Sequence, residues 1–208
     1  MTRTVRFWLF AAVAALLLAG ALAAVIFYRE QDKPFGFELE WMHAVARDRN
    51  DVLTALALVF DAIGGGWIGV LVIPIGVVVL LLLLRRPWAA LYSVVAAAGT
   101  AGVVQLLKQL LGRARPEDIL VTADYGSFPS GHSANAAALA VVFGVVFARA
   151  WVWAAGAVYC VAMMLSRTYL GAHWISDTIG GLLVGAGVAI IAWCLFAPRL
   201  ERESRGRR

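Results

Sequence analysis

Long apolar runs alternate with short polar connections along most of the chain. A run of about 20 apolar residues is long enough to cross a bilayer as a helix. Six runs approach that length: 7–28, 67–84, 88–111, 132–148, 151–164 and 174–196. The fifth, 151–164, is short and is expected to extend to about Tyr169. Tryptophans mark several of their ends, as is typical of an aromatic belt at the membrane surface. The pattern therefore predicts an all-α bundle of six transmembrane helices.

Residues 29–65 interrupt this alternation. Between residues 37 and 47, apolar positions recur at helical spacing among polar ones, which predicts an amphipathic helix lying in the membrane interface. The next apolar piece, 52–63, is too short to span alone and ends at three consecutive glycines, so we expect it at the membrane surface or entering part-way. We expect 29–65 to be an outer-face interfacial segment within a single domain covering 1–208.

Composition supports an integral membrane protein. The chain is 62% hydrophobic and 15% charged, whereas about 25% charged residues is usual for soluble domains. The net charge of +5 lies mostly in the ends and short loops beside apolar runs, which membrane topology explains better than nucleic-acid binding. Cys160 and Cys194 fall within apolar runs, so we interpret them as small buried residues rather than as disulfide partners or metal ligands.

The first apolar run has two interpretations. Arg3 and Arg6, the apolar stretch after them and Ala21-Leu22-Ala23 resemble a secretory signal peptide. The run stays apolar through Tyr28, however, which makes it long enough to span, and an uncleaved first helix is favoured.

Lysines and arginines set the expected orientation. With an inner N-terminus, the inner segments hold a slight excess of these cations, which grows when three candidate site residues, Lys108, Arg115 and Arg167, are set aside. Positive charge favours the inner side. We therefore expect a multi-pass protein of the cell membrane whose site faces outward.

Three polar segments lie between residues 108 and 177, in the middle of this apolar sequence. They contain Lys108 with Arg115-Pro116, then Pro129-Ser130-Gly131-His132, then Ser166-Arg167 with His173 and Asp177. Charge within membrane-spanning sequence is costly and marks a candidate functional site. Counting the helices places all three segments at the same, outer face of the membrane, so we expect them to converge there.

The residue types in these segments fit a phosphate-binding site. Lys108, Arg115 and Arg167 can neutralise a dianionic phosphate, arginine by planar recognition and lysine as a point charge. Ser130 is expected to cap the helix that follows it, whose free N–H groups would bind an anion. Gly131 would let the backbone approach that anion closely.

The two histidines add acid–base and nucleophilic chemistry. His173 and Asp177 are four residues apart and share one helix face. A carboxylate bonded to one imidazole nitrogen would fix the tautomer and leave the other nitrogen free to attack phosphorus. His132 would protonate the departing oxygen. The set supplies positioning and charge neutralisation without a metal or other cofactor.

Taken singly, most of these residues have ordinary structural explanations, and Arg113 is interpreted as a loop cation.

The three segments resemble the type 2 phosphatidic acid phosphatase superfamily. Its pattern is Lys-x6-Arg-Pro, Pro-Ser-Gly-His and Ser-Arg-x5-His-x3-Asp, and all three parts are present in order. The resemblance covers the chain from about residue 67 onward. It implies a metal-independent phosphatase that forms a phosphohistidine on His173, oriented by Asp177, with His132 as general acid. It assigns phosphate binding to Lys108, Arg115, Ser130, Gly131 and Arg167.

The same resemblance implies a lipid phosphate as substrate. Undecaprenyl pyrophosphate is favoured, with phosphatidylglycerophosphate or phosphatidate close behind. A lipid phosphotransferase would use the same phosphohistidine but pass the group to another lipid. A transporter or lipid-binding protein, in which the cations only hold an anion, is the non-enzymatic alternative. Vanadate haloperoxidases share the anion site, but they are soluble and larger, so that branch is disfavoured.

Overall fold

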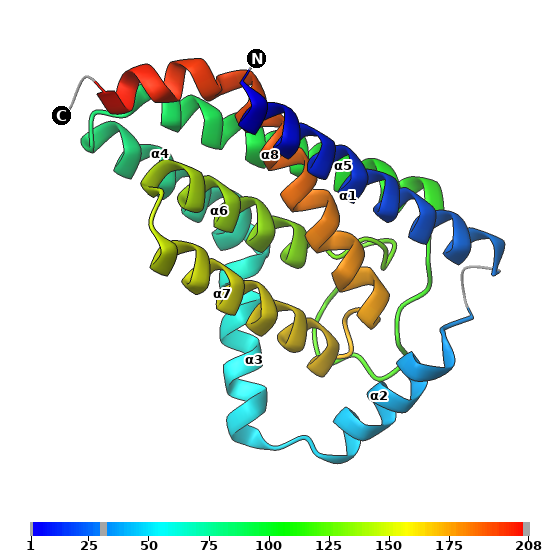
Figure 1. Ribbon diagram of the computed structural model, residues 1–208. Coiled ribbons are helices and arrows are strands. Elements are labelled where there is room, and N and C mark those ends of the chain that lie inside the picture. Colours follow the sequence, from blue (N-terminus) through cyan, green and yellow to red (C-terminus); the bar gives the residue numbers. More distant parts are fainter. Residues whose placement is uncertain (1, 30–32, 206–208) are drawn as a thin grey trace.

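The computed structural model describes residues 2–29 and 33–205, and all regular structure within them is helical (Figure 1). The prediction of an all-α protein is confirmed. The helices are α1 (Arg3–Tyr28), α2 (Gly36–Arg47), α3 (Asp51–Gly64), the π-helix η1 (Ile68–Val72), α4 (Ile73–Leu83), α5 (Pro87–Leu111), α6 (Gly131–Phe147), α7 (Ala150–Tyr169) and α8 (Ile175–Arg205).

Several of these helices can cross a membrane. Within the described residues, α1, α5, α7 and α8 are long and apolar enough to do so on their own. The helices on either side of the break after α3 pass the same test only together, which gives up to five spans. α6 is apolar but has 17 residues, somewhat fewer than an average span. The protein is therefore a multi-pass membrane protein, and a count of six spans stays a prediction.

The segment between the first and second predicted spans is built differently from the expectation. α3 continues through η1 into α4 as one bent pair with an angle of 46°, so residues 52–63 belong to the same broken helix as the second predicted span. The break falls at Gly64–Gly66, where Gly66 has a φ of +55° that favours glycine. α2 forms where the amphipathic pattern predicted it, while its placement in the membrane interface stays a prediction.

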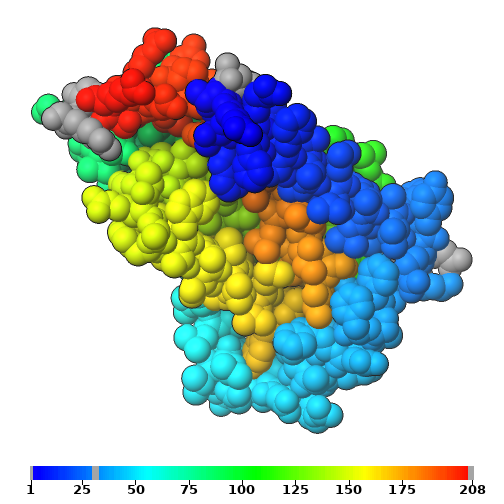
Figure 2. Space-filling model, viewed as in Figure 1, coloured from blue at the N-terminus to red at the C-terminus, as the bar shows by residue number. Residues whose placement is uncertain are grey.

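α8 is the central helix of the bundle and packs against α1, α5 and α6 (Figure 1). In the space-filling view, its side chains are visible between those of α1 and α7 (Figure 2). Small residues permit this close packing, as is common between membrane helices. A side chain added at Gly181 would meet the Ser130 carbonyl, and one added at Gly185 would meet that of Ala134.

This packing brings the helix ends of the three motifs together. The Ser130 N–H, at the start of α6, donates to the carbonyl of Asp177 in the first turn of α8, at 2.9 Å. The backbone after the end of α7 folds back, so that the His173 N–H donates to the Arg167 carbonyl at 3.3 Å. The predicted convergence of the three segments at one end of the bundle is confirmed.

Candidate active site

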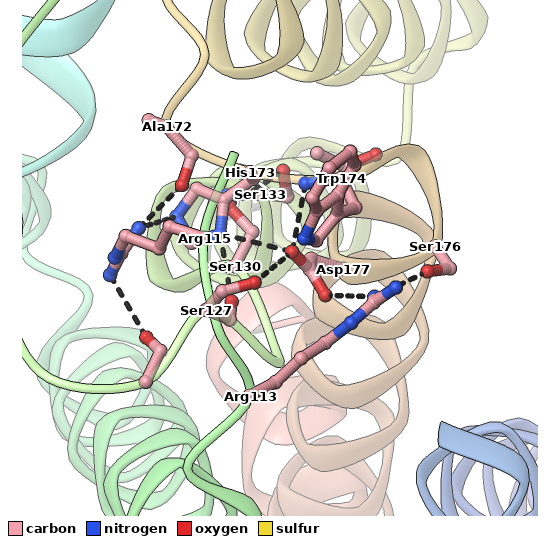
Figure 3. Close-up of polar contacts among 12 residues, drawn as sticks. Arg113, Arg115, Ser127, Ser130, Ser133, Ala172, His173, Trp174, Ser176 and Asp177 are labelled. Carbon is pink, nitrogen blue, oxygen red and sulfur yellow. Dashed lines mark hydrogen bonds and ion pairs between the residues drawn. The ribbon is translucent and has the colours of Figure 1, made fainter. Parts of the chain in front are cut away.

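His173 lies buried between the end of α7 and the start of α8 (Figure 3). Its Nδ1 is 2.8 Å from the Ser127 carbonyl oxygen, which can only accept, so Nδ1 carries the proton and Nε2 keeps its lone pair. Burial, with smaller contributions from neighbouring arginines, lowers the pKa of His173 to about 3 against the opposing effect of Asp177. The ring is therefore neutral at physiological pH, as a nucleophile must be.

The expected hydrogen bond from the His173 imidazole to the Asp177 carboxylate is not formed. Asp177 Oδ2 is 3.7 Å from Nδ1, beyond hydrogen-bond distance. Other donors occupy the carboxylate: the Ser127 hydroxyl, the Trp174 N–H at 2.8 Å and Arg113 Nη1 at 2.6 Å (Figure 3). Because Asp177 sits in the first turn of α8, its carboxylate satisfies one of the free N–H groups there, that of Trp174. It reaches the imidazole through Ser127, whose hydroxyl it binds and whose carbonyl orients the ring.

Two predicted cations meet beside His173. Lys108, near the end of α5, is only 3% exposed, and its Nζ donates to Asp124 Oδ1 and to the Gly126 carbonyl, both at 2.9 Å. Arg115 donates to the same Asp124 oxygen at 2.7 Å and lies 3.3 Å from His173 Nε2. The end of α5 and the loop after it thus bring two cations together on Asp124, and one of them, Arg115, lies next to the candidate nucleophilic nitrogen.

The third cation and the second histidine meet on the other side of the site. Arg167 Nη1 forms an ion pair with Asp61 Oδ1. His132 Nε2 lies 3.1 Å from the Asp61 carbonyl and 3.4 Å from its Oδ1. Asp61 is in α3, close to the break at Gly64–Gly66, so the broken helix forms part of this site.

Ser130 and Gly131 form the start of α6. Ser130 is the N-cap, as predicted, and its Oγ accepts from the Ser133 N–H at 3.4 Å. Gly131 faces open space, since an added Cβ would meet only Val104, at 3.7 Å. An anion can therefore approach the free N–H groups at the start of this helix closely.

A cavity of about 880 Å³ joins these groups. Six of the eight predicted site residues line it: Lys108, Arg115, Gly131, His132, Arg167 and His173. Ser130 and Asp177 lie behind the cavity wall and are fully buried. Away from the cations, the cavity continues between α4, α5 and α6 along apolar side chains such as Val77, Ala97 and Leu139. One compartment thus offers a polar end for a headgroup and an apolar extension for a hydrocarbon chain.

The family model of the PAP2 superfamily matches residues 88–201, more than half of the chain. The chain belongs to the PAP2 superfamily. The resemblance seen in the three sequence segments is thereby confirmed.

Relatives in this superfamily include named lipid phosphatases. A lipid A 1-phosphatase of Rhizobium johnstonii is 30% identical over 53% of this chain and 49% of its own. Phosphatidylglycerophosphatase B of Bacillus subtilis is 31% identical over 49% of this chain and 55% of its own. The chain thus spans about half the length of these relatives.

Two solved structures share the fold. The phosphatidylglycerolphosphate phosphatase of Bacillus subtilis has a TM-score of 0.75 and 24% identity over 87% of this chain and 93% of its own. LpxE of Aquifex aeolicus has a TM-score of 0.67 and 24% identity over 76% of this chain and 95% of its own. The agreement in fold extends well beyond residues 88–201.

Three acidic residues and one arginine at the site had no functional role in the sequence interpretation. Asp61 and Asp124 pair with the cations that line the cavity. Glu38, on α2, is fully buried and accepts from Arg113 Nη2 at 2.8 Å, while Arg113 Nη1 binds Asp177. Asp61 and Glu38 precede the segment that the PAP2 family model matches. Their only signal in the sequence was a carboxylate close to an apolar run.

Proposed function

We propose that this protein is a membrane lipid phosphate phosphatase that removes a terminal phosphate through a phosphohistidine on His173. The observation that carries the proposal is one cavity lined by a neutral His173, three cations and a second histidine. Binding alone would not need a neutral imidazole whose tautomer is fixed by a backbone carbonyl. Lipid phosphatases among the PAP2 relatives support the same reaction class.

The proposed reaction has two balanced steps. In the first, His173 Nε2 attacks phosphorus, the bond from phosphorus to the leaving oxygen breaks, and His132 gives that oxygen a proton. In the second, water attacks the phosphohistidine while His132 takes the water proton, which releases inorganic phosphate and restores both histidines. Lys108, Arg115 and Arg167 stabilise the negative charge on the phosphoryl oxygens in both steps.

A polyprenyl or acyl lipid is the proposed substrate class. The apolar extension of the cavity between α4, α5 and α6 suits a hydrocarbon chain, while the cations bind the terminal phosphate. Undecaprenyl pyrophosphate is favoured, and phosphatidylglycerophosphate and phosphatidate are the alternatives. Relatives named for related chemistry include an undecaprenyl-diphosphatase of Sulfolobus acidocaldarius, 35% identical over 69 residues. From the distribution of Lys and Arg, we propose that the site faces the outer side of the cell membrane.

Phosphate trapping tests the mechanism. Purified protein in detergent is mixed with a lipid carrying a ³²P-labelled terminal phosphate, quenched in alkali and examined for label on histidine. Wild type should trap label and release phosphate, and His173→Ala should do neither. His43→Ala, which removes an exposed histidine on α2, is the matched control and should behave as wild type. Phosphate release by His173→Ala at the wild-type rate would refute the proposal. Comparing release rates across a panel of lipid phosphates would rank the substrates.

A further inference from the structure

The cations of the candidate site are already paired with carboxylates that lie outside the three motifs. Asp61 binds Arg167 and lies against His132. Asp124 binds Lys108 at 2.9 Å and Arg115 at 2.7 Å. Each of the three cations proposed to hold the phosphate therefore has an aspartate at its charged end.

These carboxylates occupy hydrogen-bond donors that a phosphate would need. Nη1 of Arg167 is bound to Asp61, whereas its buried Nε has no hydrogen-bond partner among the described residues. A buried donor without a partner is uncommon and points to a missing acceptor. Lys108 and Arg115 converge on one oxygen of Asp124, as they would on one oxygen of a phosphoryl group.

Both aspartates remain accessible from the cavity or from water. The side chain of Asp124 is 59% exposed and that of Asp61 is 30% exposed, while the cations they bind are largely buried. Burial opposes ionisation of Asp124, but the hydrogen bond and charge of Lys108, together with the charge of Arg115, keep its pKa below the ordinary value. The carboxylate is therefore charged at neutral pH. Because it lies on a loop, it can turn into water when another anion arrives.

We propose that Asp61 and Asp124 are substitute anions that a substrate phosphate must displace, and that they thereby select dianionic terminal phosphates over monoanionic phosphodiester headgroups. This inference rests on the proposed role of the three cations in phosphate binding. Displacing both aspartates takes two negative charges away from Lys108, Arg115 and Arg167. A monoanionic phosphodiester returns only one of them, whereas a dianionic phosphate returns both. The distinction matters because phosphodiester lipids greatly outnumber any lipid monophosphate in a membrane.

Charge-neutralising variants test this selection. Asp61→Asn and Asp124→Asn are purified in detergent, and the affinity for vanadate, used as a phosphate analogue, is measured by isothermal titration calorimetry. Inhibition of phosphate release by phosphatidylglycerol in mixed micelles is measured alongside. Each variant should bind vanadate about tenfold more tightly than wild type, the scale of one charge-assisted hydrogen bond that no longer has to be broken. Phosphatidylglycerol should inhibit wild type only weakly and should inhibit both variants at lower concentration.

A purely structural role for the aspartates predicts the opposite change in vanadate affinity. If Asp61 served to hold Arg167 and His132 in place, its removal would weaken vanadate binding, and weaker or unchanged binding in the variants would overturn the proposal. Asp48→Asn removes an exposed carboxylate outside the cavity and should leave vanadate affinity unchanged. If Asp61→Asn does not fold, Asp124→Asn decides, since its loop side chain is exposed. The calorimetry requires no turnover, so a protein that binds vanadate without releasing phosphate would refute only the proposed function.

Discussion

Replacing Arg113 should destabilise the fold more than any surface charge does. Arg113 is 2% exposed and lies between two carboxylates that are fully buried, Glu38 and Asp177. Its Nη1 donates to Asp177 at 2.6 Å and its Nη2 to Glu38 at 2.8 Å. In Arg113→Ala both carboxylates lose their counter-ion while staying away from water.

The size of the effect follows from this burial. Removing one partner of a buried ion pair costs about 3–5 kcal/mol, because the other charge is left uncompensated. We therefore expect Arg113→Ala to lower the free energy of unfolding by at least about 3 kcal/mol. In the Arg113→Ala background, Glu38→Gln should lower the free energy of unfolding much less than it does in wild type, since it then removes an unpaired charge. The difference between the two losses is the coupling energy, which should be about 1–3 kcal/mol.

Reversible unfolding in mixed SDS and dodecylmaltoside micelles, followed by circular dichroism, measures these free energies. The wild type, both single variants and the double variant complete the thermodynamic cycle. Arg47→Ala, on the same helix as Glu38 but with an exposed ion pair, is the control and should change stability by about 0–1 kcal/mol. A loss in the free energy of unfolding of less than about 1 kcal/mol in Arg113→Ala would refute the assignment of a coupled buried network. So would a double variant whose loss equals the sum of the two single losses.

Three further predictions concern the histidines and the reaction. In Gly65→Ala the new Cβ would overlap the His132 ring, so kcat should fall by about 10²-fold through loss of the general acid. The control is Gly76→Ala, which has open space around the new Cβ and should keep wild-type kcat. The pKa of His173 is about 3 in the fold against an ordinary 6.5, so the unfolded chain alone takes up this proton between those values. Stability should therefore fall as pH decreases from 6.5 toward 3, by up to about 1.4 kcal/mol per pH unit from this group, and unfolding of His173→Gln across that range should show a shallower slope. Phosphate release should persist in excess EDTA, because three fixed cations supply the charge; activity restored only by added magnesium would contradict this.

The sequence was sufficient to predict the helices and the cluster of motif residues because both follow from strong local patterns. Long apolar runs have few stable structures other than a membrane helix. Charged residues placed at successive helix ends must then meet at one face of the bundle. Lys108, Arg115, His132, Arg167 and His173 indeed line one cavity, and Ser130 caps α6 as expected.

The hydrogen-bond partners of these residues depended on packing that no local pattern encodes. The i, i+4 spacing placed Asp177 near His173. Its oxygens accept instead from the Trp174 N–H, the Arg113 guanidinium and the Ser127 hydroxyl, so a backbone carbonyl orients the ring. Likewise, the break after α3 appeared in the sequence as three glycines, but only the packing of α3 against α7 shows that it delivers Asp61 to Arg167.

The division of the chain suggests how selectivity arises in this protein. Residues 88–201, which match the PAP2 family, contain all three cations, both candidate reacting histidines and Asp124. The residues before 88 add Asp61, which pairs with the cavity-lining Arg167, and Glu38, which pairs with Arg113. In the proposal above, carboxylates next to the cations weaken the binding of every anion that enters, and most of all the binding of ligands with a single charge. Through Asp61, the segment outside the family match would then share with Asp124 in setting which anions are bound, while the proposed reaction uses groups within the match.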